Sequence, residues 1–261
     1  MARRGSVEIG AVSRCRRLLA VVRLFGRRRT TQGGAPKPKS RRDAASLVVN
    51  HVGLHELTPD ITRYLGQAAY LQLSIFETLT GCLDNAPSTA AKEAVSEIAA
   101  VSLTKHRGLV AEIERRGDDA GTVMAPYSQR IDEFRRTTLG ADWHETLITC
   151  YVTAGILDEL FVSLAAGLPG DYPAKMTALL SGDEESQLLA SMLRDAIDAN
   201  PHLASRLAMW GRRLVGDTLL MARAALALPD NTAPDDARLE PVFTELIAAH
   251  TRRMDDLGLT A

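Results

Sequence analysis

The 261-residue sequence predicts an all-α protein built as a helical bundle. Apolar side chains recur every three or four residues through most of the chain after the N-terminal region, which is the spacing of one buried helical stripe. Prolines in the same part of the chain leave long intervals between them, and such intervals favour long helices. Aromatic residues make up only 5% of the chain, and no segment longer than about four residues alternates apolar and polar side chains, so a sheet is not expected.

Two long helices are predicted first. Apolar residues recur with helical spacing between Pro59 and Pro87, which places the first helix there. Ser88 can accept a hydrogen bond from a free backbone N–H, so it is a suitable N-cap for a second helix that ends near Gly117.

The later helices have start signals of their own. Asp142 followed by Glu145 is a capping-box pattern and starts a third helix. Asp171, with Pro173 in the first turn, starts a fourth. The third and fourth helices are expected over 142–166 and 171–199, with a short crossover helix at 126–139, a fifth helix from 201 to about 228 and a sixth over 239–257.

This order of helices predicts a topology. Two helix pairs joined by a longer connection between residues 117 and 142 correspond to a four-helix bundle with one long crossover, which is the ferritin-like topology. The fifth and sixth helices are then additional C-terminal helices. The sequence leaves the oligomeric state open.

Charge divides the chain into two parts. Residues 1–42 carry 13 Arg or Lys and one acid, a net +12, whereas residues 43–261 carry a net −13, so the total of −1 hides two opposite blocks. Gly and Pro oppose a packed core in the basic part. We therefore predict a disordered basic tail at 1–42 and a bundle at 43–261.

The tail is the main candidate for contact with a partner. Its arginines could form a basic amphipathic helix on RNA or on an anionic membrane surface. Two other interpretations remain, a solubilising arm and a translation start further downstream. The candidate nucleic-acid-binding residues are Arg14, Arg16, Arg17, Arg27, Arg28 and Arg29.

Composition excludes several classes of protein. The three cysteines, Cys15, Cys82 and Cys150, are odd in number and form no C-x-x-C pair, so a disulfide scaffold is not expected. We expect instead a reducing, cytoplasmic compartment. No uninterrupted apolar run approaches the roughly 18–20 residues of a transmembrane segment. Phosphate-binding, dinucleotide-binding and nucleophile-elbow motifs are absent from the sequence, so no catalytic residue is assigned.

Four segments carry a family resemblance. In chain order, they are AYLQLSIF at 69–76, MAPY at 124–127, WHETLITCYV at 143–152 and RLAMWGRRLVG at 206–216. Together they resemble the ferritin-like proteins of actinobacteria related to the MiaE-type tRNA hydroxylases. The resemblance covers roughly residues 60–230.

The resemblance implies a di-iron carboxylate site that this chain has largely lost. Such sites take a Glu from the first helix, Glu-x-x-His from the second, an acid from the third and Glu-x-x-His from the fourth. The first-helix Glu falls on Gln72, the second-helix pair on Leu103 and His106, the third-helix acid on Ala154, and the fourth-helix pair on Gly182 and Glu185. Of the expected ligands, only His106 is therefore retained in kind. No Glu-x-x-His or Asp-x-x-His occurs anywhere in the sequence.

Two functions remain open at this point. The first is a non-catalytic binding or scaffold protein that has no cofactor and acts on an unknown protein or RNA partner. The alternative is a non-haem di-iron hydroxylase with two iron ions at an unconventional site built from His106 and nearby acids. The vestigial metal candidates are His106, Glu185 and Glu159, and the further acids that could join them are Glu77, Asp158 and Glu184.

Three arginines of the predicted fifth helix are weaker candidates. Arg206, Arg212 and Arg213 could contact an anionic ligand or RNA. The competing interpretation is that they pair with neighbouring acids such as Asp217, as arginines on a helix surface commonly do.

Overall fold

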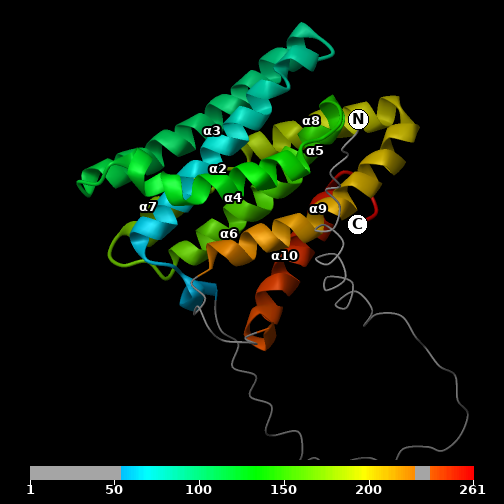
Figure 1. Ribbon diagram of the computed structural model, residues 1–261. Coiled ribbons are helices and arrows are strands. Elements are labelled where there is room, and N and C mark those ends of the chain that lie inside the picture. Colours follow the sequence, from blue (N-terminus) through cyan, green and yellow to red (C-terminus); the bar gives the residue numbers. More distant parts are fainter. Residues whose placement is uncertain (1–53, 227–235) are drawn as a thin grey trace, which may run out of the picture. The chain divides into compact units, whose positions relative to one another are not determined.

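The computed structural model describes residues 54–226 and 236–261 of the chain, and within those ranges it is helical with no strand (Figure 1). The prediction of an all-α, ferritin-like bundle with additional C-terminal helices is confirmed. The tail at 1–42, with its six candidate arginines, lies outside the described residues.

The helices follow in the predicted order. The long helices are α2 (Ile61–Gly81), α3 (Thr89–Arg115), α4 (Ala120–Thr138), α9 (Pro201–Ala225) and α10 (Asp236–Asp256). The shorter ones are α5 (Trp143–Thr149), α6 (Gly155–Ala165), α7 (Tyr172–Leu180) and α8 (Glu184–Ala199), with 3-10 turns at Leu54–Leu57 and Leu83–Asn85. In Figure 1, α5 and α6 lie between the α2–α3 pair and the α9–α10 pair.

Side-chain caps start the helices where the sequence places them. The hydroxyl of Ser88 accepts a hydrogen bond from the Ala91 N–H at 3.1 Å. Asp142 accepts one from the Glu145 N–H at 3.0 Å, and the Glu145 carboxylate accepts one from the Ala141 N–H at 2.9 Å. Both predicted start signals are therefore confirmed. Such caps stabilise the start of a helix because they satisfy backbone N–H groups that have no partner inside the helix.

The prediction of one continuous fourth helix over 171–199 is wrong. The chain leaves the helical conformation at Ser181–Asp183, which separates α7 from α8. Gly182 lies in this break, where glycine's large conformational freedom opposes a continuous helix. The carboxylate of Asp171 makes no cap and instead pairs with the Lys175 ammonium at 2.9 Å.

A π-helical turn interrupts the predicted third helix. It spans Cys150–Ala154 between α5 and α6, and all five of its residues are buried. A π-turn adds a residue to the helical repeat, so side chains after it point in directions that a regular helix does not predict.

The segment that contains this turn is the most apolar part of the described chain. By length and composition, Trp143–Ala165 could cross a membrane, but 78% of its most apolar stretch is buried inside the protein. A helix that is apolar on every side is expected at the centre of a bundle. No other helix within 54–226 and 236–261 is long and apolar enough.

Candidate functional site

Four helices each contribute a polar side chain to one buried cluster. The Lys105 ammonium on α3 donates to Asp158 Oδ2 on α6 at 2.8 Å and to Glu185 Oε1 on α8 at 2.6 Å. Gln72 on α2 donates from Nε2 to Asp158 Oδ1 at 2.6 Å. These residues, Gln72, Lys105, Asp158 and Glu185, form what we call the lysine cluster.

Burial governs the electrostatics of the lysine cluster. The exposed fraction is 5% for the Lys105 side chain and 11% for each carboxylate side chain. Burial opposes the charge of Lys105, but the two carboxylates outweigh it and raise the lysine pKa. Burial raises the pKa of Asp158 and of Glu185, and the lysine offsets only part of that effect. One ammonium therefore faces two carboxylates in a poorly hydrated place.

Three polar atoms beside these contacts have no hydrogen-bond partner. They are Gln72 Oε1, Ser102 Oγ and Glu185 Oε2. Ser102 lies one helical turn before Lys105 on α3 and is only 1% exposed. Buried polar atoms are rarely left without a partner in folded proteins, so these atoms indicate a place for a further group.

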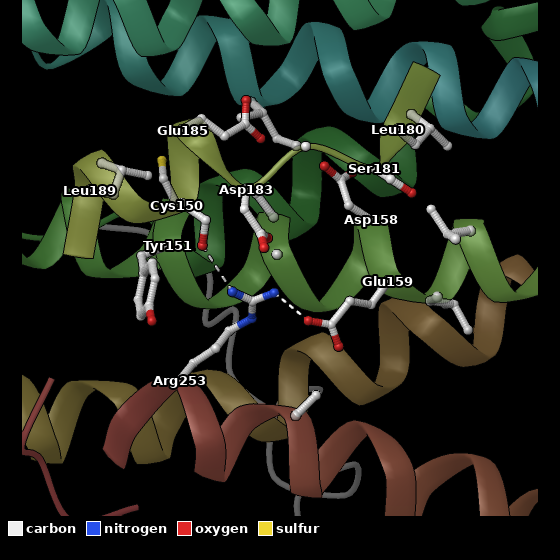
Figure 2. Close-up of a pocket in the computed structure, with 18 of the residues that line it drawn as sticks. Cys150, Tyr151, Asp158, Glu159, Leu180, Ser181, Asp183, Glu185, Leu189 and Arg253 are labelled. Atoms are coloured by element: carbon white, nitrogen blue, oxygen red, sulfur yellow. Dashed lines mark hydrogen bonds and ion pairs between the residues drawn. The ribbon is translucent and has the colours of Figure 1, made fainter. Parts of the chain in front are cut away.

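A cavity of about 730 Å³ adjoins the lysine cluster, and Ser102, Asp158 and Glu185 line it. Figure 2 shows the carboxylates of Asp158 and Glu185 on one side of the cavity, with the Arg253 guanidinium reaching toward it from the opposite side. Cys150 also lines the cavity, but burial raises the pKa of its thiol, so the thiol stays protonated at neutral pH.

Arg253 of α10 bridges the two walls of the cavity. Its guanidinium pairs with Glu159 of α6 and donates to the Ser186 hydroxyl of α8 at 3.1 Å. It also lies 5.6 Å from the centre of the Tyr151 ring, which is a cation–π distance. A side chain at Gly155 would collide with this guanidinium, so glycine is what allows the close approach.

The sequence candidates for metal binding are only partly brought together. Glu185 belongs to the lysine cluster, whereas Glu159 pairs with Arg252 and Arg253 nearer the surface. His106 lies next to Lys105 in sequence, but its Nδ1 is 2.9 Å from the Ala69 carbonyl oxygen. Because a carbonyl only accepts hydrogen bonds, Nδ1 carries the proton and is committed to the backbone.

The other acidic candidates lie outside the cluster. Glu77 pairs with Arg135 at 3.4 Å, and Glu184 is exposed at the start of α8. Asp158, in contrast, belongs to the lysine cluster and lies about one helical turn after Ala154, on which the family pattern falls in the sequence.

The arginines of α9 have structural partners. Arg206 pairs with Asp142 and lies 3.6 Å from Glu145. Arg212 donates to the Thr260 carbonyl at 3.2 Å, and Arg213 lies 5.3 Å from the centre of the Trp210 ring.

The donor set of the lysine cluster does not fit a pair of metal ions. Two-metal sites in bundles of this topology take four carboxylates and two histidines. The lysine cluster offers two carboxylates, and both already bond an ammonium. Within the described ranges, no three His, Cys, Asp or Glu side chains are grouped so that they could hold a metal ion.

Lys105 and Ser102 are the residues that reasoning from the sequence missed. The buried face of α3 runs through Val95, Ile98, Ser102, Lys105 and Leu109. A lysine on the apolar stripe of a long helix needs a buried counter-charge. The place of Lys105 on this apolar stripe was therefore the signal in the sequence that could have identified the cluster.

Comparison with known proteins agrees with the fold. A family model described as the ferritin-like domain of actinomycetes matches residues 58–232. A search of curated proteins returned no match for the chain.

Proposed function

We propose that this chain, which belongs to the family of actinomycete ferritin-like domains, is a non-catalytic binding protein whose bundle has lost its di-iron ligands. The observation that carries the proposal is the Lys105 ammonium, which bonds carboxylates from two different helices at 2.8 and 2.6 Å. We also propose that this chain is related to the MiaE-type hydroxylases, and this part of the proposal rests on the four sequence segments at 69–76, 124–127, 143–152 and 206–216.

The physical basis is competition for the same carboxylate oxygens. Asp158 and Glu185 are oxygen ligands of the kind that iron and manganese bind. An ammonium held between them neutralises charge that a metal would otherwise neutralise, and it occupies one oxygen of each carboxylate that a pair of metal ions would need as ligands. Lys105 thus supplies internally the positive charge that carboxylates in a bundle core require.

Elemental analysis tests the proposal. The full chain is incubated with Fe(II), Mn(II) or Zn(II), desalted, and analysed by mass spectrometry of the elements. We expect no stoichiometric metal. A pair of metal ions retained on each chain would overturn the proposal.

The alternative function is a hydroxylase-like enzyme with two iron ions near His106. It has less support, because His106 is bonded to a backbone carbonyl and lies outside the lysine cluster. The variant His106→Ala distinguishes the two functions. The enzyme hypothesis requires that this variant lose both metal retention and tRNA hydroxylation, whereas the binding-protein proposal expects neither property in the parent.

We also propose that residues 1–42 attach the protein to RNA. The support is the net +12 of this segment beside the net −13 of the rest of the chain, which should itself repel phosphate. The full chain and a chain lacking 1–42 are compared on immobilised RNA at low and high salt. We expect retention only for the full chain at low salt, and equal retention of both chains would refute the role of the tail.

A cytoplasmic location is the last part of the proposal. Cys82 and Cys150 are free, buried thiols, which suits a reducing compartment. Fractionation of cells that produce the full chain tests it, and recovery in an exported fraction would overturn it.

A further inference from the structure

We infer that the cavity beside the lysine cluster binds a small aliphatic amine, whose ammonium group lies against Glu185 Oε2 and Ser102 Oγ. The inference rests on the proposed binding role and names the ligand class for it.

Two unpartnered oxygens provide the polar end of this site. Glu185 uses Oε1 for Lys105, while its Oε2 is buried and has no partner. The Ser102 hydroxyl is also unpartnered, and that side chain is 99% buried on the wall of the same cavity. A carboxylate oxygen accepts hydrogen bonds and cannot donate them, so the missing group has to be a donor.

Charge selects a cation as that donor. The lining of the cavity includes five acids, Asp158, Glu159, Asp183, Glu185 and Glu245, and two bases, Arg252 and Arg253. Lys105, which bonds Asp158 and Glu185 and is not part of the lining, adds one further positive charge, so the acids still outnumber the bases. A net negative, partly dehydrated cavity favours a positive ligand and repels an anion.

The remaining walls are apolar and the space suits a small molecule. Ile75, Leu79, Ile98, Leu180 and Leu189 line the cavity together with the acids. Its volume of about 730 Å³ lies within the roughly 300–1,000 Å³ typical of small-molecule sites. An alkyl chain can therefore lie against the leucines and isoleucines while its ammonium faces Glu185.

An organic ammonium fits this site better than a metal ion does. Hard cations such as Mg²⁺ and Ca²⁺ need about six or more oxygen ligands at short distance. The oxygens without a partner here are few, and the neighbouring carboxylate atoms already bond Lys105. An ammonium needs only a few acceptors, because it carries three N–H donors.

Titration calorimetry of the full chain tests the inference. The probes are n-butylamine and 1,4-diaminobutane, with 1-butanol as the neutral isostere and butyrate as the anion. Phosphate buffer replaces Tris, because Tris is itself an amine. The variants are Glu185→Gln and Ser102→Ala, with Glu184→Gln and Ser96→Ala as matched controls on the same helices. Glu184 and Ser96 are both exposed and lie outside the cavity lining.

We expect saturable binding of at least one amine and none of butanol or butyrate. Loss of one hydrogen bond to a charged group should weaken binding about tenfold to a hundredfold in Glu185→Gln. Ser102→Ala should weaken it less, and both control variants should bind as the parent does. Circular dichroism checks that each variant is folded, and Ser102→Ala serves if Glu185→Gln does not fold.

Three results would overturn the inference: no saturable binding of either amine, equal binding of butanol and butylamine, or unchanged amine affinity in both cavity variants. None of them bears on the metal content. A metal-free protein that binds no amine would thus leave the proposed loss of the di-iron ligands standing, while stoichiometric metal would refute that proposal whatever the amine result.

Discussion

Replacing Lys105 with methionine removes the ammonium of the lysine cluster and keeps an unbranched side chain that is one atom shorter. Asp158 and Glu185 then lose hydrogen bonds of 2.8 and 2.6 Å and are left as buried carboxylates without their counter-charge. Removing one partner from a buried ion pair costs about 3–5 kcal/mol, because the remaining charge stays dehydrated. We expect the free energy of unfolding of Lys105→Met to fall by about that amount near neutral pH.

The loss should depend on pH with a defined sign. Burial already raises the pKa values of both carboxylates above their ordinary values. Without the lysine, those pKa values rise further. A carboxylate whose pKa is raised by folding stabilises the fold at low pH and loses that contribution as the pH rises through the raised pKa. The difference between the parent and Lys105→Met should therefore shrink as the medium is acidified.

Urea unfolding followed by circular dichroism measures this difference at each pH. The matched control is Lys92→Met, which changes an exposed lysine of the same helix. A further variant makes the whole cluster apolar (Gln72→Leu, Lys105→Met, Asp158→Leu, Glu185→Leu) and should recover most of the lost stability, because it leaves no buried charge behind. If Lys105→Met were no less stable than Lys92→Met, the reasoning about the lysine cluster would be refuted.

Further predictions concern packing, protonation and hydrogen bonding, all measured by chemical unfolding. Gly66→Ala should lower the free energy of unfolding by about 1–3 kcal/mol, because a methyl group there meets the Val123 carbonyl oxygen. Gly216→Ala faces open space and should raise the free energy of unfolding by about 0.5–1 kcal/mol. Equal effects of the two variants would contradict this reasoning. His250 is buried with neither ring nitrogen hydrogen-bonded, and burial lowers its pKa from 6.5. The parent should therefore lose stability as the pH falls below about 6.5, by at most about 1.4 kcal/mol per pH unit from this group, and His250→Leu should lose less. Tyr64→Phe removes a hydroxyl that donates to a main-chain carbonyl at 2.7 Å and should cost about 1 kcal/mol, and an unchanged stability would show that this bond contributes nothing.

The tertiary structure adds most where distant segments meet. Asp158 lies 86 positions from Gln72 and 53 positions from Lys105, and it bonds both. Lys105 also bonds Glu185, which lies 80 positions away. Arg253 reaches Glu159 across 94 positions. Periodicity identifies the buried face of each helix but carries no information on which residues of two faces lie at the same height, so a sequence pattern could not predict this cluster.

Two local deviations interrupt the helices that the sequence predicts as continuous over 142–166 and 171–199. The π-turn at Cys150–Ala154 shifts the register before Asp158, and the break at Ser181–Asp183 starts α8 anew just before Glu185. A shift of one residue rotates a side chain by about 100° around a helix, so even a single insertion changes which side chain points inward.

The sequence by itself determined the fold class, the order of the helices and several of their starting points, because apolar periodicity and capping act within one or two turns of chain. Ser88 and Asp142 cap their helices through hydrogen bonds that span only three residues. Only the tertiary structure decided that an ammonium from α3 lies between carboxylates of α6 and α8, and that Ser102 and Glu185, each with an unpartnered oxygen, help to line a cavity. That arrangement depends on how the helices are rotated and shifted against one another, and packing of the complete core sets those quantities.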